Sequence, residues 1–199
     1  MFTGKTKVFR HNADDPGSLL DDRVYSVLGD HTGTVWIATR GGLERFDAKT
    51  ERFVHYRHDD ADPRSLSDNF VWPLLEDRNG NLWVGTNLGG LNRFDRATES
   101  FTRYPHDESN IRSLAGDQVY SLYQDSSGMI WVGMADHGVD RFHPVLAHFA
   151  HVLHDPAKKN SLADNNILSF CIERSGTAWI GTAAGLNRWD RKSVAFTLF

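Results

Sequence analysis

One short pattern recurs four times in this chain and constrains its fold more than any other feature. In every copy a tryptophan follows an acidic residue by six positions and a glycine by three, and an Ile or Val comes directly after it. The tryptophans are Trp36, Trp83, Trp131 and Trp179, so the copies lie 47, 48 and 48 residues apart. A repeat of this length is typical of blades or arrays of small structural units.

Each repeat unit reads as four short strands. A nearly continuous apolar segment, such as residues 71–76, precedes the pattern and suits a strand that is covered on both faces. The acidic residue and the glycine then favour a tight turn, so the tryptophan strand returns antiparallel. A third strand is expected near 90–95 and a fourth near 101–104. These features predict an all-β fold, a β-propeller with four-stranded antiparallel blades.

The unit boundaries follow from a Ser-Leu pair whose leucine lies 17 residues before each tryptophan. A two-sheet sandwich would not need one motif repeated in register, so the propeller is favoured. The third unit lacks the Asp-x-x-Thr turn after its third strand, and we expect an irregular outer hairpin there. The predicted segments are the last strand of a preceding blade (1–17) and four blades (18–64, 65–112, 113–160 and 161–199).

Charge and hydropathy exclude several classes of partner. The net charge is -4, and Lys and Arg are scattered along the chain, so we expect no nucleic-acid partner and no binding to an anionic membrane. No apolar run approaches the roughly 18 residues that span a bilayer, and residues 1–5 lack the apolar segment of a signal peptide. We therefore expect no membrane insertion by this segment.

The complete pattern resembles the two-component regulator propeller repeat. It comprises Ser-Leu, Val-Tyr-Ser, Asp-x-x-Gly-x-x-Trp, Gly-Leu-Asn-Arg-Phe-Asp and a closing Phe-x-x-Tyr, and it covers nearly every residue. The resemblance implies a periplasmic sensor domain that precedes a β-sandwich, a membrane helix and a cytoplasmic histidine kinase or diguanylate cyclase. It also implies a propeller of about seven blades, of which these four units form a part.

The two ends of the chain raise a question of assembly. Both carry a predicted fourth strand, one near Val8 and Phe9 and one at 195–199, so a ring closed by strand exchange would hold one strand too many. An uncovered blade face of on the order of 500 Å² would cost ~12 kcal/mol. We therefore expect the chain either to close as four blades or to self-associate into a dimer or larger ring.

The residue types that often carry chemistry have structural explanations here. All six tryptophans are expected to pack in the core. The histidines of the repeat, at 11, 58, 106 and 154, suit a role in the loops, and the turn carboxylates suit backbone capping. Cys171 lies between two apolar residues and is expected to be a buried, inert thiol. We predict no catalytic residues, no metal site and no cofactor.

Residues that differ between units offer better candidates for a binding site. The loops between second and third strands share one face with the long connections between units, and this face is the expected ligand side. Its candidates are Arg40, Asn87, Asp136 and His137, with ordinary solvated loop residues as the alternative. The predicted function is a non-catalytic sensor of a small extracellular ligand such as an oligosaccharide. The alternatives are a protein-interaction scaffold and a propeller lyase or hydrolase.

Overall fold

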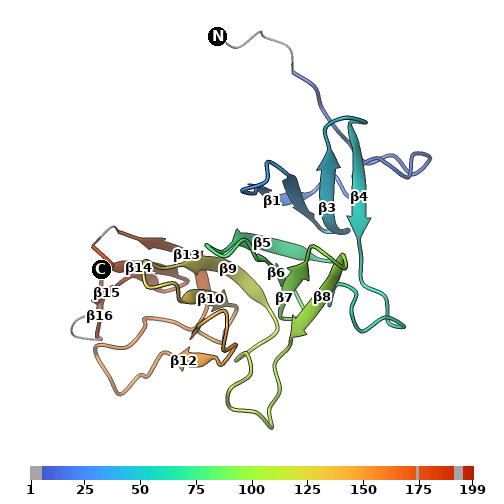
Figure 1. Ribbon diagram of the computed structural model, residues 1–199. Helices are drawn as coiled ribbons and strands as arrows, with labels where there is room; N and C mark the ends of the chain where they lie inside the picture. The colour runs from blue at the N-terminus through green and yellow to red at the C-terminus, as the bar shows by residue number, and fades with distance from the viewer. Residues whose placement is uncertain (1–5, 174, 191–194) are drawn as a thin grey trace.

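The computed structural model describes residues 6–173, 175–190 and 195–199. Within these residues the chain forms four sheets of four antiparallel strands, and each sheet keeps its strands in sequence order (Figure 1). Each sheet is one blade, so the prediction of an all-β propeller is confirmed. No helix in the described part of the chain is long and apolar enough to span a membrane.

The strands of the four blades fall where the repeat places them. Blades 1 and 2 comprise β1 (Val24–Gly29), β2 (Val35–Thr39), β3 (Gly42–Asp47), β4 (Arg52–Tyr56), β5 (Val71–Glu76), β6 (Leu82–Thr86), β7 (Leu91–Asp95) and β8 (Ser100–Tyr104). Blades 3 and 4 comprise β9 (Val119–Gln124), β10 (Ile130–Met134), β11 (Val139–Phe142), β12 (Ala150–Val152), β13 (Ile167–Ile172), β14 (Ala178–Thr182), β15 (Gly185–Asp190) and β16 (Ala195–Leu198). The three-residue β12 confirms the irregular outer hairpin of the third unit.

The repeated acidic residue builds the turn between the first two strands. Asp30 accepts hydrogen bonds from the backbone N–H groups of Thr32 and Thr34, and Gly33 takes a φ of 83°. The second carboxylate oxygen of Asp30 accepts a hydrogen bond from the indole N–H of Trp36 at 2.8 Å. The indole bond recurs in the other three blades at 2.9, 2.9 and 2.7 Å. Turn capping was expected from the sequence, whereas the indole partner was not.

The apolar core lies between blades. We call the face of a sheet toward the next blade its forward face and the opposite one its backward face. Trp36 and Tyr56 on the forward face of blade 1 pack against Phe94 on the backward face of blade 2, with ring centroids 5.0 Å apart in both pairs. Equivalent clusters join blades 2 and 3 and blades 3 and 4. The same repeat positions therefore build every interface.

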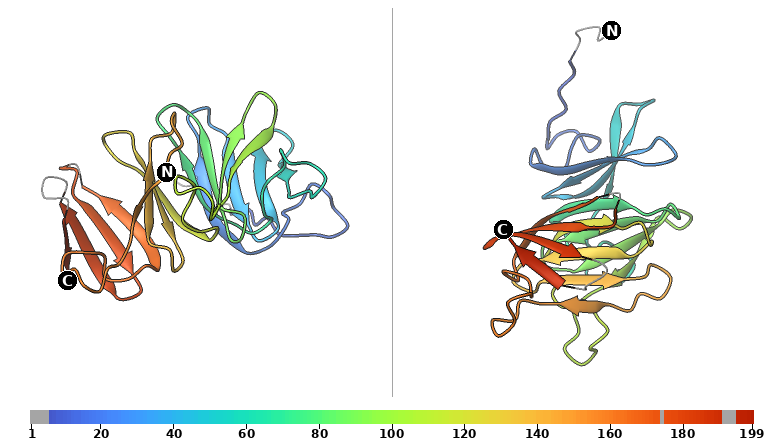
Figure 2. Two further views of the ribbon diagram at one scale, coloured as in Figure 1. Left: turned by 90° about the horizontal axis from the view of Figure 1, so that it is seen from below. Right: turned by 90° about the vertical axis from the view of Figure 1, so that its left-hand side faces the viewer.

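The four blades form an open arc, so the expectation that the chain closes as four blades is wrong (Figures 1 and 2). Strand packing joins each blade to the next, but no comparable packing joins blade 4 to blade 1 among the described residues. Val27 on the backward face of blade 1 is 63% exposed, and Phe199 on the forward face of blade 4 is 66% exposed. The three interfaces between successive blades therefore leave one face of blade 1 and one face of blade 4 uncovered.

The prediction that Cys171 is buried is wrong, and so is the prediction that all six tryptophans pack in the core. Both errors arise because some of these residues lie on surfaces that no neighbouring blade covers. Cys171 is exposed because it lies on the forward face of blade 4, where no blade covers it. Its counterpart Leu75 packs against the core between blades 2 and 3. Trp179 is only partly buried for the same reason, and Trp72 is partly exposed because it lies at the inner edge of the arc. The other four tryptophans are buried.

The N-terminal segment was predicted to be the last strand of a preceding blade, and this stays a prediction. In the described part of the chain, residues 6–10 pair with no strand. The Phe9 ring nevertheless packs against Phe46 and Phe53, with centroids 5.2 and 5.5 Å away. In the next repeat, Tyr56 packs in the same way against Phe94 and Phe101. The position of Phe9 thus matches the repeat, although its backbone is unpaired.

Candidate functional site

Irregular pairing marks the start of the first strand in every blade. These inner strands, β1, β5, β9 and β13, pack side by side along the arc. The register of each shifts against the second strand near its first residues. A β-bulge leaves a residue out of the regular alternation and re-aims its side chain. The residues at the shift share one repeat position, and they are Tyr25, Trp72, Tyr120 and Leu168.

The bulges produce a row of aromatic side chains along the inner edge of the arc. Trp72 lies 5.7 Å from Tyr25 and 4.4 Å from Tyr120 between ring centroids, and both pairs meet edge to face. Phe70 adds a fourth ring, 5.0 Å from Tyr25 and 5.1 Å from Trp72. Tyr25 is 40% exposed. Exposed rings with polar edges can stack on the apolar face of a ligand while their hydroxyl or N–H groups hydrogen-bond to it.

Two of the four residues predicted from the sequence, Arg40 and Asn87, contact Phe70 of this row. Arg40 is exposed, and its guanidinium lies 5.7 Å from the centre of the Phe70 ring. The backbone N–H of Asn87 donates to the Phe70 carbonyl, and the Asn87 side chain accepts a hydrogen bond from Gln118. Arg40 and Asn87 therefore meet around one aromatic residue.

Asp136 and His137 lie on the next loop of the same face. Both are exposed, and Asp136 takes a positive φ of 58°. The Gln118 carbonyl accepts the N–H of Ala135, and the Ala135 carbonyl accepts a hydrogen bond from Nδ1 of His137 at 2.7 Å. A continuous line of contacts thus runs from Arg40 to His137. We call this line together with the aromatic row the inner rim.

Charged groups surround the first part of the inner rim. Arg23 and Asp21 lie on the connection that leads into β1 and form a paired ion bridge with distances of 3.0 and 3.1 Å. The hydrogen bond from Arg23 lowers the pKa of Asp21, and the positive charge of Arg40 lowers it further. Both carboxylate oxygens of Asp21 are therefore occupied, and Arg40 remains the exposed cation beside Phe70.

Buried polar residues of the third strands hold the connections in place beneath this face. Glu44 accepts the N–H of Leu20 at 3.1 Å, and Asp140 accepts that of Ala115 at 2.8 Å. Burial raises the pKa of Glu44 to about 7, although the Leu20 hydrogen bond opposes it. Burial also raises the pKa of Asp140, against the hydrogen bond from His151. These carboxyl groups are structural, since neither is exposed.

The repeated histidines have the loop role that the sequence predicts. Nδ1 of His58 donates to the Leu66 carbonyl at 2.8 Å, and its backbone N–H donates to Asn69. The same pair of bonds recurs at His11, His106 and His154. Within the described residues no group of three or more His, Cys, Asp or Glu side chains is placed to hold a metal ion.

Sequence reasoning proposed the polar residues that the inner rim includes, but it did not propose the aromatic ones. Tyr25, Trp72 and Tyr120 share a repeat position, and this equivalence suggested packing in the core. The bulge that turns them inward has no reliable sequence signal, because it depends on pairing with the second strand. The presence of three aromatic residues and one leucine at a single position is the one clue that the sequence provides.

Comparisons with known proteins support the reading of the repeat. A model of the two component regulator propeller matches residues 18–41, 65–88 and 113–136, which cover the first half of blades 1, 2 and 3. These blades are two component regulator propeller repeats. Each match contains the inner strand, the turn and the tryptophan strand of one regulator propeller blade. No curated protein matches the chain significantly.

Solved structures share the fold of this chain. The extracellular domain of the hybrid two component system BT3049 from B. thetaiotaomicron is 24% identical with a TM-score of 0.79, over 94% of this chain and 25% of that one. The extracellular domain of BT4673 from the same organism is 22% identical to this chain, with a TM-score of 0.77. The match covers 96% of this chain and 26% of that one. This chain therefore spans about a quarter of their length. A gluconolactonase from Xanthomonas campestris is 15% identical with a TM-score of 0.60, over 91% and 64%.

Proposed function

We propose that this chain is a ligand-recognition segment of the sensory region of a bacterial two-component receptor. The observation that carries the proposal is the match of three blades to the regulator propeller repeat. The fold shared with extracellular domains of hybrid two component systems supports the same reading. In such a receptor the segment lies in the periplasm, and any kinase or cyclase activity belongs to other domains.

The inner rim is the proposed ligand site of this sensor. Its aromatic row offers faces for stacking, and Arg40, Asn87, Asp136 and His137 supply donors and acceptors beside it. Apolar rings with a few polar groups at the edge are the usual chemistry of small-molecule sites. A short neutral oligosaccharide has alternating apolar faces and hydroxyl groups, so a glycan fragment is the proposed ligand class.

Calorimetric titration of this chain with a panel of neutral oligosaccharides tests the proposal. We expect saturable heat from at least one sugar and its loss in a Trp72→Ala, Tyr120→Ala double variant. The quadruple substitution of Arg40, Asn87, Asp136 and His137 by alanine is expected to weaken binding as well. Lys49→Ala is the control, because Lys49 lies in the turn between β3 and β4 at the opposite face. Unchanged binding in both inner-rim variants would refute the site.

The distant likeness to a gluconolactonase favours a second candidate, an enzyme that uses the same face. Turnover of a lactone or a glycoside by this chain would support it, whereas binding without turnover would support the sensor. Sensing itself is tested in the receptor that carries the segment. There the quadruple variant is expected to abolish the response to the inducing sugar, and an unchanged response would contradict the proposal.

A further inference from the structure

The connection into blade 3, residues 105–118, is bound at two points by one acid and one histidine. Asp140 of β11 and His151 of β12 lie opposite each other in the sheet, and Nδ1 of His151 lies 2.5 Å from Oδ1 of Asp140. Oδ2 of Asp140 accepts the N–H of Ala115 at 2.8 Å. Nε2 of His151 lies 3.1 Å from the carbonyl oxygen of Ile111. The pair therefore ties this connection to the outer strands of its blade.

All three contacts can be hydrogen bonds only while a proton lies between the two side chains. The Ile111 carbonyl is only an acceptor, so Nε2 of His151 carries a hydrogen. Nδ1 then faces a carboxylate oxygen, and a proton on either atom makes this contact a hydrogen bond. Without that proton, the lone pair of Nδ1 faces an anionic oxygen. Because Asp140 is fully buried, water cannot replace the lost bond unless the connection moves.

Blade 2 fastens its own connection at the same positions without a titrating pair. Asn92 and Arg103 lie opposite each other in that sheet. Asn92 accepts the N–H of Ser67 at 3.1 Å, and Nε of Arg103 donates to the Ser65 carbonyl at 2.9 Å. An arginine stays charged and an asparagine stays neutral across the physiological pH range. The molecule thus contains a titrating and a non-titrating version of one anchor.

The surroundings of Asp140 favour retention of the proton. Burial raises the pKa of Asp140, whereas the hydrogen bond and the charge of His151 lower it, as does the charge of His106 on the connection. The facing blade contributes apolar side chains, since Val132, which lies opposite Asp140 in the sheet, packs in one cluster with Leu91 of blade 2. The raised pKa means that the proton stays to a higher pH than on an exposed aspartate and is lost as the pH rises further.

The connection runs from this pair to the inner rim. Gly116 lies so close to His137 that a Cβ atom on it would be 2.6 Å from the imidazole ring. The Gln118 side chain donates to the side-chain oxygen of Asn87 at 2.8 Å. Residues 115–118 therefore contact the rim loops of both blade 2 and blade 3, and a shift of this segment changes the spacing of those loops.

We propose that Asp140 and His151 form a proton-dependent clamp that fixes the blade 3 connection and, through it, the spacing between Asn87 and His137. The clamp is closed while the pair holds its proton and opens as that proton is lost at alkaline pH. The clamp itself rests on the contacts of the pair, whereas its effect on ligand binding rests on the proposed function of the inner rim. A sensor with this device binds its ligand more weakly in alkaline than in mildly acidic surroundings.

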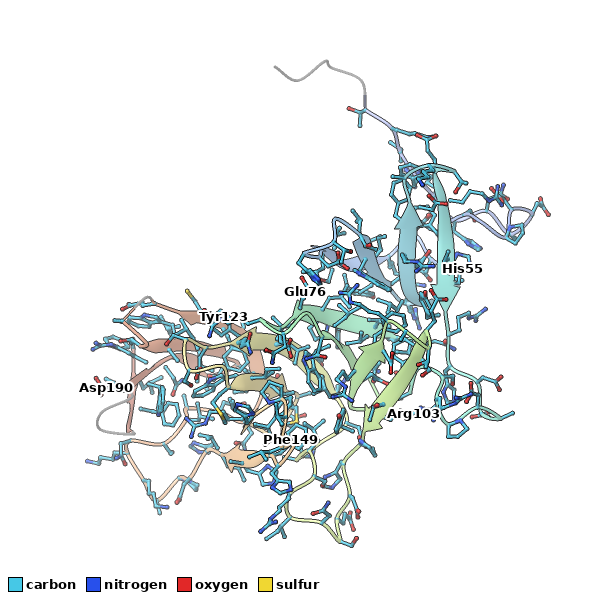
Figure 3. The ribbon with its side chains drawn as sticks, viewed as in Figure 1. His55, Glu76, Arg103, Tyr123, Phe149 and Asp190 are labelled. Atoms are coloured by element: carbon cyan, nitrogen blue, oxygen red, sulfur yellow. The ribbon has the colours of Figure 1, made fainter. Side chains whose placement is uncertain are left out.

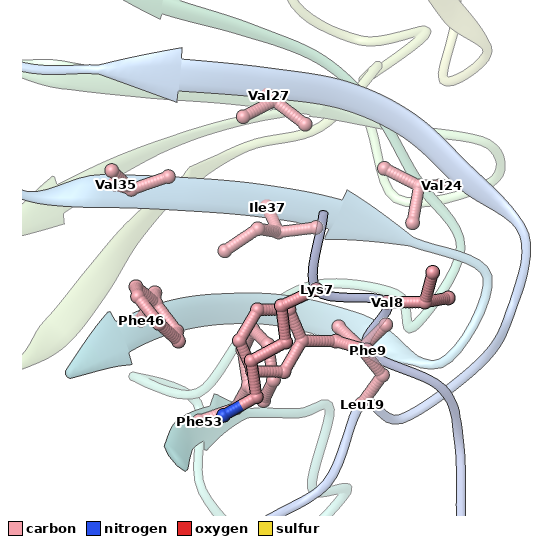
Figure 4. Close-up of a pocket in the computed structure, with 10 residues that line it drawn as sticks. All are labelled: Lys7, Val8, Phe9, Leu19, Val24, Val27, Val35, Ile37, Phe46 and Phe53. Carbon is pink, nitrogen blue, oxygen red and sulfur yellow. The ribbon is translucent and has the colours of Figure 1, made fainter. Parts of the chain in front are cut away.

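Blade 1 contains a looser pair of the same kind. Glu44 accepts the N–H of Leu20. Nε2 of His55 lies 2.8 Å from the Ser18 carbonyl but 3.5 Å from the Glu44 carboxylate. Ile37, which lies opposite Glu44 in the sheet, lines an apolar cavity on the uncovered face of this blade (Figure 4). The blade 3 pair is tighter and lies between two covered faces, so it provides the decisive test.

Hydrogen exchange of the full chain, followed by NMR, tests the clamp. The measured quantity is the exchange rate of the Ala115 amide divided by that of the Ser67 amide, which we call the exchange ratio. Because Ser67 is bound by Asn92, the ratio cancels the general effect of pH on exchange. It is expected to rise about ten-fold between about pH 5 and about pH 8, with the midpoint of the His151 ring signals. A ratio that does not change would overturn the clamp.

A double variant is the matched control. Asp140→Asn combined with His151→Arg copies the pair of blade 2. Asparagine also suits this position in blade 4, where Asn187 accepts the N–H of Ala163 at 2.8 Å. The exchange ratio of the double variant is expected to be the same at both pH values. A pH dependence that survives in it would overturn the proposal, because the pair then contains no titrating group.

The effect on the inner rim is measured separately from the clamp. The side-chain amide signals of Asn87 are expected to titrate with the His151 ring in the native chain and to stay in place in the double variant. A neutral oligosaccharide that binds at about pH 5 is expected to bind about three-fold more weakly at about pH 8, in the native chain alone. Equal affinities beside a changed exchange ratio would overturn the coupling to the rim. If no sugar binds at either pH, the proposed function fails, and the exchange ratio still decides the clamp.

Discussion

The interface between blades 1 and 2 and the two outward faces are built from the same repeat positions, yet only the interface is buried. Leu74 packs between blades, whereas its counterpart Val27 is mostly exposed. Leu28 packs in the same cluster, whereas its counterpart Cys171 is exposed. The repeat therefore decides which residue occupies a position, and the neighbouring blade decides whether that residue is buried.

Substitution of two equivalent tryptophans is expected to give the largest difference in stability between a covered and an uncovered face. Trp83 is fully buried between blades 2 and 3, and Trp179 occupies the same position on the uncovered face of blade 4. Trp83→Ala is expected to lower the free energy of unfolding by about 3–5 kcal/mol, because it leaves a cavity. Trp179→Ala is expected to cost about 1 kcal/mol or less in dilute solution. Urea unfolding measures both, and equal losses would show that the two faces are equally covered.

The buried carboxyl group of Glu44 tests whether the uncovered face of blade 1 lets water reach the interior of that blade. Its pKa is raised to about 7, so the carboxyl of Glu44 stabilises the fold most below about pH 4.5, and this contribution is lost as the pH rises through 7. Glu44→Gln should therefore be more stable than the native chain at pH 8, by up to about 3.5 kcal/mol at ~1.4 kcal/mol per pKa unit, with no gain at pH 4.

Blade 3 provides the control for this pH dependence, because it is covered on both faces. Asp140→Asn should show a gain of the same sign at high pH, since burial raises the pKa of Asp140 as well. Thermal unfolding between pH 4 and pH 8 measures both differences. A gain in Asp140→Asn alone would mean that water reaches Glu44 through the open face.

The ion pair of Arg96 across the covered interface has no counterpart on the outward face of blade 1 among the described residues, because Ala48 occupies the equivalent position. Arg96 of blade 2 binds Asp30 of blade 1 at 2.6 Å and Glu76 of its own blade at 2.9 Å. Glu76 lies where the two blades meet (Figure 3). Arg96→Ala leaves the buried Asp30 without its cation and is expected to cost about 1–2 kcal/mol at pH 7. Lys49→Ala, in the equivalent turn of blade 1, is expected to cost nearly nothing.

The same variant should change the response to acid. Burial opposes ionisation of Asp30, but hydrogen bonds from Thr32, Trp36 and Arg96 together lower its pKa below the usual range. The stability that Asp30 contributes is therefore present above about pH 4 and is lost as the pH falls further. Because Arg96→Ala removes one of these bonds, its destabilisation should shrink at pH 3. A cost that does not change with pH would contradict this role of Arg96.

The sequence was sufficient to predict the fold because the same motif occurs in it four times. Four copies of the acidic residue, glycine and tryptophan at fixed spacing identify the hairpin, and the structure confirms the strands that follow. The sequence also led to Arg40 and Asn87 as candidates for the site, because they differ from their counterparts in a loop, and this assignment stays a prediction. These signals are local and need no knowledge of neighbouring blades.

What the sequence did not predict depends on contacts between distant segments. The exposure of Cys171 depends on whether another blade follows, and no residue near Cys171 records this. The position of Trp72 depends on a bulge in its pairing with β6. The open arc depends on the rotation at each interface, which arises from the packing of many side chains together. The sequence repeat therefore predicts the structure of each blade better than it predicts the arrangement of the blades.

Thiol labelling of the native chain is the most direct test of the central claim, that the four blades form an open arc whose two end faces are uncovered. Cys171 is the only cysteine, so its reaction with a thiol reagent reports on one face alone. We expect labelling nearly as fast as in the unfolded chain, because Cys171 is exposed. In a Leu75→Cys, Cys171→Ser variant the thiol lies between blades 2 and 3 and should be protected. Protection of Cys171 to the same degree would mean that the blades close on themselves, and would contradict the account.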